Sequence, residues 1–252
     1  LLVAYMRTIA NLSPRITVQD IARTHEGRPI LGLTITSPEN HARIDEIKAA
    51  HVALSDPESA QEVSEDMPVI TWLNYGVHGA EVSSTDSSMA VAYHLAAAQG
   101  PEIEETLENS VIILIAVFNP DGNSRMSAWN HMNGGYVSVS DPEHRLHNTF
   151  WPGGRTNHYW FDLNRQWLII QHPEPRGWVA KFHEWRPNIT VDYHEMGSAS
   201  TYYFHPGAPE RTFPYIPERS MELLDLVANR PRSWLDSEQR LYFHEEGFDN
   251  YY

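Results

Sequence analysis

The stretch "PVITWLNYGVHGAEVSSTDSSMAVAYHLAAA" (residues 68–98) contains a strand signal and a helix signal with only a short connection between them. Residues 68–76 form a short apolar run of the kind typical of a buried strand. Residues 82–98 are rich in alanine and contain neither Pro nor Gly, which predicts a helix. A strand that leads directly into a helix is the repeating unit of α/β folds, so this stretch predicts that class.

The rest of the chain repeats this alternation. Residues 16–37 alternate apolar and polar side chains on both sides of "HEGRP", which predicts a β-hairpin. Further strands are predicted at 110–118 and 188–194, and helices at 174–185 and 217–229. The expected architecture is a mixed, mostly parallel twisted sheet flanked by helices. Because we find no linker and no internal repeat, we predict one domain over residues 1–252.

Two segments between the predicted elements lack a regular period. "NPDG" (119–122) is a strong turn signal behind the strand at 110–118. Residues 126–161 mix Gly, Pro, Asn, His and aromatic residues, which predicts an unusually long loop. Such a loop is either a surface excursion held by its aromatic side chains or a wall of a binding cleft, and the sequence leaves both open.

Composition excludes several functional classes. The 18 basic and 33 acidic residues give a net charge of −15, which argues against nucleic acid and anionic membranes as partners. The longest apolar run has eight residues, too few to cross a bilayer, so no membrane insertion is expected. The absence of cysteine excludes disulfides, thiolate zinc sites and cysteine nucleophiles.

The cellular compartment cannot be read from these features. The chain begins with Leu1 instead of Met, so we expect a mature or trimmed fragment. A secreted or periplasmic location is therefore slightly favoured over a cytoplasmic one.

Candidate metal ligands follow two of the predicted strands. His78 and Glu81 come after the strand at 68–76, and His194 ends the strand at 188–194. Ligands of open α/β sheets collect at the carboxyl ends of strands, and residues at i and i+3 of a first helical turn share a face. Two His and one Glu, with water in the fourth position, is a recurrent catalytic zinc set, although the spacing excludes a His-Glu-x-x-His helix.

Each of these residues also has an ordinary interpretation. One His-x-x-Glu pair is what chance predicts for a chain with 14 histidines and many glutamates. Taken alone, His78 fits a loop histidine, Glu81 a carboxylate at a helix N-terminus, and His194 a hydrogen-bonded strand end. The pattern by itself leaves both interpretations open.

Four motifs taken together are far more specific. "HGAE" (78–81), "NPDG" (119–122), "DLNR" (162–165) and "DYHEMGS" (192–198) follow one another in the order seen in zinc metallocarboxypeptidases. Over roughly residues 15–252 the chain resembles the carboxypeptidase A-like family, the funnelins. "GRPI" (27–30) and "YFHEEGFDNYY" (242–252) resemble a microbial branch of it.

The resemblance implies a carboxypeptidase A-like (phosphorylase/hydrolase-like) fold and a zinc-dependent enzyme. The implied reaction is hydrolysis of the C-terminal peptide bond of a substrate with a free carboxylate. His78, Glu81 and His194 match the ligands of one Zn²⁺ per chain. Asp162 matches the carboxylate that orients a ligand histidine.

The resemblance also implies substrate-binding residues. Asn164 and Arg165 match the pair that binds the terminal carboxylate, and a guanidinium suits that role through two parallel hydrogen bonds. Arg125, three residues past "NPDG", is the candidate that polarises the scissile carbonyl. Arg145 and Arg155 lie in the same long loop and weaken that assignment.

The catalytic set implied by the resemblance lacks one member here. The family's general base is a glutamate that follows a late apolar strand, and Glu195, Glu245 and Glu246 do not stand in that context. We therefore expect the base to lie beyond Tyr252 and the catalytic domain to be truncated before its end. Tyr251 or Tyr252 could match the family's substrate-capping tyrosine.

Two other functions stay open. A catalytically inactive, carboxypeptidase-like binding module would keep the scaffold without the base. A zinc amidase or deacylase would use the same ligands on a non-peptide amide. In all three cases the expected partner is a peptide or small amide with a free C-terminal carboxylate.

Overall fold

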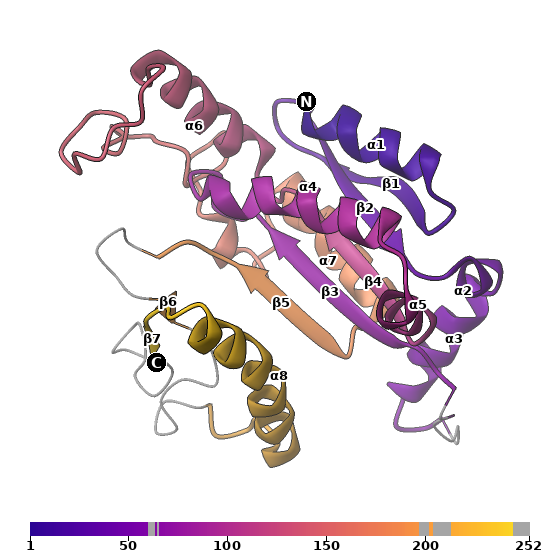
Figure 1. Ribbon diagram of the computed structural model, residues 1–252. Coiled ribbons are helices and arrows are strands. Elements are labelled where there is room, and N and C mark those ends of the chain that lie inside the picture. The colour runs from indigo at the N-terminus through magenta and orange to yellow at the C-terminus, as the bar shows by residue number, and fades with distance from the viewer. Residues whose placement is uncertain (60–63, 65, 197–201, 204–212, 244–252) are drawn as a thin grey trace. The chain divides into compact units, whose positions relative to one another are not determined.

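The computed structural model describes residues 1–59, 64, 66–196, 202–203 and 213–243 (Figure 1). The chain divides into two compact units, Leu1–Glu195 and Met196–Tyr252, which are described separately below. The single domain over residues 1–252 stays a prediction.

The first unit is built on a five-stranded sheet in the order β1-β2-β4-β3-β5. The strands are β1 (Ile16–Arg23), β2 (Pro29–Ile35), β3 (Val69–Tyr75), β4 (Ser110–Ile115) and β5 (Ile189–Tyr193). β1 pairs with β2, and β2 with β4, in antiparallel fashion, whereas β3 pairs with β4 and with β5 in parallel. The predicted mixed sheet and the hairpin within 16–37 are confirmed, and two of the four strand pairings are parallel.

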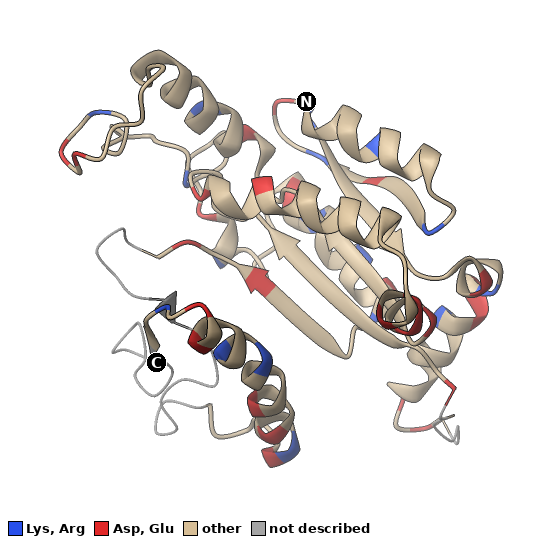
Figure 2. Cartoon of the chain, in the orientation of Figure 1, with Lys and Arg blue, Asp and Glu red and all other residues tan. Residues whose placement is uncertain are grey.

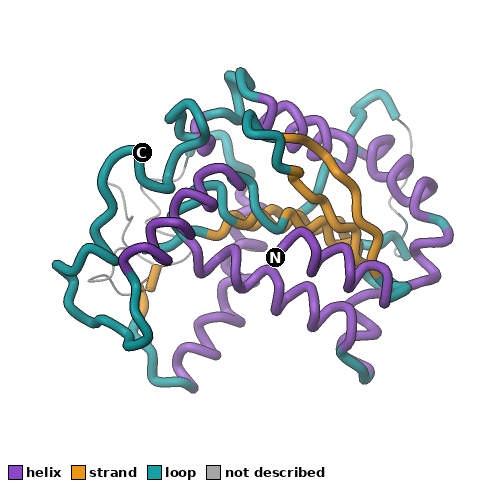
Figure 3. Tube along the Cα trace, turned by 90° about the horizontal axis from the view of Figure 1, so that it is seen from above, coloured by secondary structure: helices purple, strands orange, loops and turns teal. Residues whose placement is uncertain are grey.

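Helices cover both faces of this sheet, as Figures 1 and 3 show. In chain order they are α1 (Leu2–Leu12), α2 (Pro38–Ala42), α3 (Ile44–Leu54), α4 (Val82–Ala97), α5 (Pro101–Glu108), α6 (Pro120–Asn133) and α7 (Pro173–Trp185). The predicted helices at 82–98 and 174–185 correspond to α4 and α7. The sequence analysis did not predict α1, α2, α3 or α5.

The core consists of two clusters, one on each face of the sheet, because successive side chains of a strand point to opposite faces. Leu73 and Tyr75 of β3 pack with residues of α1, α4 and α5, whereas Ile70 and Trp72 pack with residues of α3 and α7. β4 alternates in the same way, with Leu114 on the first side and Ile113 on the second. Both faces of the middle strands are therefore buried.

The charge distribution agrees with this arrangement (Figure 2). β2, β3 and β4 carry no charged residue, as expected of strands that are covered on both faces. Among the three parallel strands only β5 carries a charged residue, Asp192, one position before its carboxyl end. This charge lies beside the candidate metal ligands.

The prediction for the segment after β4 was wrong in two respects. "NPDG" does not form a turn behind the strand but begins α6. The Asn119 side chain caps this helix by accepting a hydrogen bond from Gly122 N, and Pro120 occupies the first helical turn. Consequently residues 126–133 are helical, and only 134–161 of the predicted loop lack a long helix or strand.

The second unit contains α8 (Glu218–Ser237) and a two-stranded parallel sheet of β6 (Tyr202–Tyr203) and β7 (Tyr242–Phe243). α8 corresponds to the predicted helix at 217–229 but extends past Pro231. None of the helices in the described parts of the chain combines the length and the apolar character that crossing a bilayer requires.

Candidate metal centre

The two predicted ligand histidines leave the sheet side by side because their strands are parallel neighbours in register. Tyr75 of β3 pairs with Tyr193 of β5, and their rings stack with centroids 4.3 Å apart and planes 5° from parallel. Chain continuation beyond this pair brings His78 and His194 to the same edge, with ring centroids 5.0 Å apart. Both candidate ligand histidines therefore lie at the carboxyl edge of the sheet, where ligands of open α/β sheets collect.

Glu81 reaches the site through a turn, not through the first helical turn that the spacing suggested. The Glu81 N–H donates to the His78 carbonyl at 3.1 Å, and α4 begins only after Glu81. Gly79 lies within this turn against the start of α6: a Cβ placed there would be 2.1 Å from Asn123 N. Glycine is required at position 79 because two segments of backbone meet there.

The side chains of His78 and His194 converge on the Glu81 carboxylate. His78 Nδ1 lies 2.8 Å from Glu81 Oε1, and His194 Nδ1 lies 3.0 Å from Glu81 Oε2. Each histidine uses its other ring nitrogen on a different carboxylate: His78 Nε2 is 3.0 Å from Asp162, and His194 Nε2 is 2.9 Å from Asp192. Both Nδ1 atoms thus face the centre and both Nε2 atoms are anchored outside it.

Burial and hydrogen bonding shift the pKa values of Glu81 and the two histidines in opposite directions. Burial raises the pKa of Glu81, but hydrogen bonds with His194, His78 and the Glu195 N–H outweigh it and lower that pKa to about 2. Hydrogen bonds with Asp192 and Glu81 raise the pKa of His194 to about 10. His78 is more deeply buried, which lowers its pKa, yet its bonds to Asp162 and Glu81 raise that pKa overall. The hydrogen bonds among the three groups therefore favour their charged forms.

The same geometry suits a metal ion. One donor atom from each of His78, Glu81 and His194 lies within 4.8 Å of the others. The side chain of His78 is 4% exposed, that of Glu81 15% and that of His194 33%, so solvent reaches the set from one side. Two imidazoles and a carboxylate with one open side fit the donor set of a catalytic zinc site.

Asp162 is held in place by its own backbone context. It caps a short 3-10 helix, Leu163–Arg165, by accepting from Asn164 N at 2.9 Å through the same oxygen that faces His78. Its other oxygen accepts two hydrogen bonds from Arg155, at 3.2 and 2.9 Å. The carboxylate is therefore oriented on both sides, as expected of a group that fixes a ligand histidine.

The structure places the three candidate arginines in different surroundings. The Arg125 guanidinium donates to the carbonyls of Gly153, Thr156 and Asn157, so it is used in holding the backbone of the long loop. Arg155 instead reaches the centre, where its Nη1 lies 3.8 Å from Glu81 Oε1. Arg145 lies over the rings of Trp129 and Phe150. Spacing alone could not separate the three, because the fold of 134–161 decides which one points inward.

Asn164 and Arg165 follow Asp162 directly and so lie next to the centre in the chain. The Arg165 side chain is exposed, and its guanidinium donates only to the neighbouring Asn164 carbonyl, at 3.3 Å, among the described contacts. No acidic side chain within the described parts of the chain forms an ion pair with Arg165. A free carboxylate could bind there without displacing an internal partner.

Glu195 is the one predicted base candidate that lies within the described residues. The Glu195 carboxylate accepts from Ser83 N, at the start of α4, at 2.6 Å, and the Glu195 N–H donates to Glu81 at 3.0 Å. Glu195 therefore positions the centre through its backbone and its side chain. Glu245, Glu246, Tyr251 and Tyr252 lie outside the described residues.

Comparison with protein families gives a match over most of the chain. A family described as "Zinc carboxypeptidase" matches residues 2–218, which include all four motifs. No curated protein sequence is significantly similar to the chain.

Solved structures of several metallocarboxypeptidases are similar to this fold. A metallo-carboxypeptidase from Burkholderia cenocepacia is 16% identical, with a TM-score of 0.58 over 96% of this chain and 51% of its own. One from Pseudomonas aeruginosa, in complex with (2-guanidinoethylmercapto)succinic acid, is 17% identical, with a TM-score of 0.60 over 98% and 50%. Carboxypeptidase A from Helicoverpa armigera is 15% identical, with a TM-score of 0.56 over 96% and 55%. The chain thus spans about half the length of these three solved structures, and at these identities the likeness concerns the fold.

Proposed function

The chain belongs to the zinc carboxypeptidase family, and on that premise we propose that it hydrolyses the C-terminal peptide bond of substrates with a free carboxylate. The proposal further assigns one zinc ion to His78, Glu81 and His194. The observation that carries it is the position of the two histidines, whose Nδ1 atoms face the two oxygens of Glu81 while Asp162 and Asp192 hold both Nε2 atoms.

The donor set supports zinc in particular. Neutral imidazole and carboxylate are usual zinc donors, and an anchored outer nitrogen fixes the ring orientation and raises its basicity. Zinc in such a set supplies Lewis-acid polarisation of a carbonyl and activation of water near neutral pH. The half-exposed side of His194 leaves room for the substrate to approach.

Two arginines would act on the substrate in different ways. Arg155 lies beside Glu81 and Asp162, where its guanidinium can donate to a carbonyl oxygen on which negative charge develops. Arg165, exposed and without an acidic partner in the described parts of the chain, would bind the terminal carboxylate together with Asn164. This division makes the enzyme selective for the last residue of a peptide.

A second candidate function is a zinc-dependent binding module without catalysis. It is favoured by the contacts of Glu195, the one non-ligand glutamate in the described residues that is hydrogen-bonded to Glu81, because its carboxylate is already used on the start of α4. A hydrolase requires a further carboxylate as general base. The described contacts of Glu195 do not supply that carboxylate. A zinc amidase or deacylase would share this requirement.

One assay separates these functions. The full-length gene product, purified and zinc-loaded, is incubated with an N-blocked dipeptide that has a free carboxylate and, in parallel, with its C-terminal amide. Faster release of the last residue from the free acid supports the carboxypeptidase. Equal rates on both substrates support the amidase, and zinc binding without hydrolysis of either supports the binding module.

A further inference from the structure

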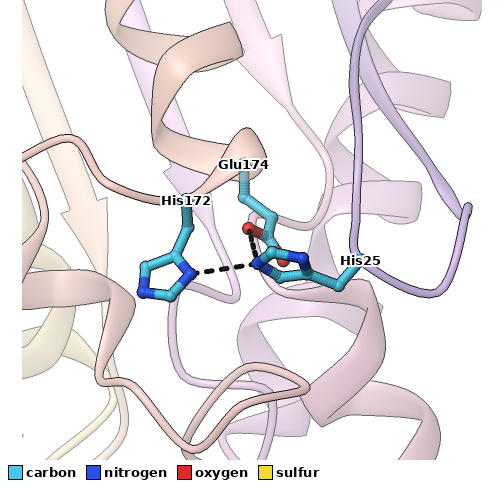
Figure 4. Close-up of side chains that lie close together, drawn as sticks. All are labelled: His25, His172 and Glu174. Carbon is cyan, nitrogen blue, oxygen red and sulfur yellow. Dashed lines mark hydrogen bonds and ion pairs between the residues drawn. The ribbon is translucent and has the colours of Figure 1, made fainter.

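A second group of two histidines and a glutamate lies outside the candidate metal centre and shares no residue with it (Figure 4). His25 is in the turn between β1 and β2, His172 is the residue before α7, and Glu174 is in the first turn of α7. In Figure 4 the two histidine rings and the carboxylate point toward one another. None of the three belongs to a motif that the proposed function uses.

The Glu174 carboxylate is buried in an unusual way. Its side chain is 0% exposed, and neither of its oxygens has a hydrogen-bond partner. The N–H groups of Glu174 and His25 lie near enough to lower its pKa without reaching hydrogen-bond geometry, so burial still raises the pKa overall. A buried carboxylate that accepts no hydrogen bond is costly, because it has lost the water that would solvate its charge.

The nearby Asp121 is a buried carboxylate whose oxygens do accept hydrogen bonds. It is also fully buried, but it accepts from Thr24 Oγ1 at 2.7 Å, from Arg28 Nη1 at 2.8 Å and from Glu26 N at 3.3 Å. The fold can therefore supply donors to a buried acid here. Glu174 accepts no hydrogen bond within the described part of the chain, so its carboxylate is open to a cation.

The two histidines face each other through their ring nitrogens. His25 Nε2 lies 3.0 Å from His172 Nδ1, and His25 Nε2 lies 3.9 Å from Glu174 Oε2. The other nitrogen of His172, Nε2, is also buried without a hydrogen-bond partner. At zinc–nitrogen distances of about 2.0–2.1 Å, two histidine donors of one ion lie roughly 2.9–3.4 Å apart, so the observed nitrogen pair already has the required spacing.

We propose that His25 Nε2, His172 Nδ1 and a Glu174 oxygen form a second binding site for a divalent first-row transition metal such as Zn²⁺. The donor atoms of the three residues lie within 4.8 Å of one another, so the Glu174 carboxylate moves toward the two histidines when an ion binds. His25 is 25% exposed at its side chain, so water completes the coordination from the solvent side. The ion compensates the buried charge that the protein leaves without donors.

The site would have a structural role, since it links the β1–β2 turn to the start of α7. α7 already touches this hairpin closely: a Cβ on Gly177 would be 2.3 Å from Ala22 Cβ and 2.5 Å from the Ile21 carbonyl. The rings of Tyr159 and Phe161 pack against His25 and His172, respectively. The two histidine rings and the backbone segments that carry the donors are therefore packed in place before any ion binds, which favours affinity.

The test is a count of bound metal together with thermal unfolding. Protein freed of metal by chelator is titrated with Zn²⁺ alone by calorimetry, and bound zinc is then counted by mass spectrometry. Wild type is expected to bind two equivalents. His25→Gln is expected to bind one and to lose the rise in Tm that belongs to the second equivalent, and His183→Ala, an exposed histidine of α7, is the matched control that keeps both.

Glu174→Gln keeps the result interpretable if a ligand variant folds poorly. It removes the buried charge, so the metal-free variant is expected to have a Tm equal to or above that of metal-free wild type, while binding one equivalent fewer. His194→Ala is expected to lose the other equivalent, so failure of the first centre and failure of this site give different patterns. The proposal is overturned if His25→Gln and Glu174→Gln bind as much zinc as wild type. A charge pair between His25 and Glu174 with no affinity for Zn²⁺ would overturn it as well.

Discussion

Asp162 Oδ1 lies 3.0 Å from His78 Nε2 and at the same time accepts from Asn164 N at 2.9 Å. One carboxylate oxygen therefore connects a candidate zinc ligand to the segment that carries the candidate substrate clamp. Burial raises the pKa of Asp162, but the bond with His78 and the charges around it hold that pKa well below its usual range. Asp162 thus stays charged and can keep the Nδ1 lone pair of His78 directed at the centre.

The first prediction concerns this contact. Asp162→Asn keeps the size of the side chain but removes the charge that fixes His78, so zinc affinity should fall about 10–100-fold. Competition with a fluorescent zinc chelator measures it. Asp86→Asn, on the exposed side of α4, is the control and should leave the affinity unchanged. An unchanged affinity in Asp162→Asn would remove Asp162 from the centre.

The second prediction separates two arginines. Arg155→Ala should lower the hydrolysis rate by about 100-fold or more, because a donor beside the reacting carbonyl is lost. Its Tm should change little, since the Arg155 side chain is 52% exposed and its ion pairs are screened by solvent. Arg125→Ala should instead lower the free energy of unfolding by roughly 1–3 kcal/mol, because the carbonyls of Gly153, Thr156 and Asn157 lose their donor. Kinetics and chemical denaturation of both variants check the pair, and the reverse pattern would assign the catalytic position to Arg125.

The strand ends that carry His78 and His194 could be predicted from the sequence, whereas the direction of the Arg155 side chain could not. The positions of the candidate ligands could be predicted because strand signals at 68–76 and 188–194 place His78 and His194 at strand ends. Parallel pairing of the two strands brings these ends together. No period or motif describes residues 134–161, so the path of that loop, and with it the direction of Arg155, could not be predicted.

Other differences have equally local causes. "NPDG" begins α6 because a capping Asn and a first-turn Pro can start a helix as well as form a turn. The second cluster was not predicted because His25 and His172 are 147 positions apart and neither ends a buried strand. The packing of α7 against β1 brings them together.

The third prediction concerns the carboxylate clamp. Arg165→Ala should lower kcat/KM for the free-acid dipeptide roughly 10–100-fold, because a charge-assisted contact is lost. The C-terminal amide offers no carboxylate to Arg165, so its rate should change little. Arg43→Ala, an exposed arginine that bonds to Asn40, is the control. Equal losses on the acid and the amide would contradict the clamp.

The fourth prediction is a pH dependence that does not involve the metal ligands. Burial, followed by the neighbouring Tyr193, raises the pKa of Tyr75 well above its ordinary value near 10. In the unfolded chain Tyr75 ionises near pH 10, whereas in the folded protein it stays neutral, so stability is complete below pH 10 and falls above it. The expected loss is about 1.4 kcal/mol per pH unit.

Tyr75→Phe isolates this effect, because it keeps the ring that stacks on Tyr193 and removes the ionising group. Between pH 9 and 11 the free energy of unfolding of wild type should fall more steeply than that of Tyr75→Phe. Urea denaturation at each pH provides the comparison. Parallel curves would show that Tyr75 does not stay neutral in the fold.

The central claim is that His78, Glu81 and His194 hold one zinc ion. Anomalous diffraction at the zinc absorption edge, from crystals of zinc-loaded wild type and of His194→Ala, tests it most directly. The expected result is a peak in wild type within about 2.0–2.2 Å of both Nδ1 atoms and a Glu81 oxygen, absent in His194→Ala. A zinc-loaded wild-type crystal with no peak between these three side chains would contradict the claim.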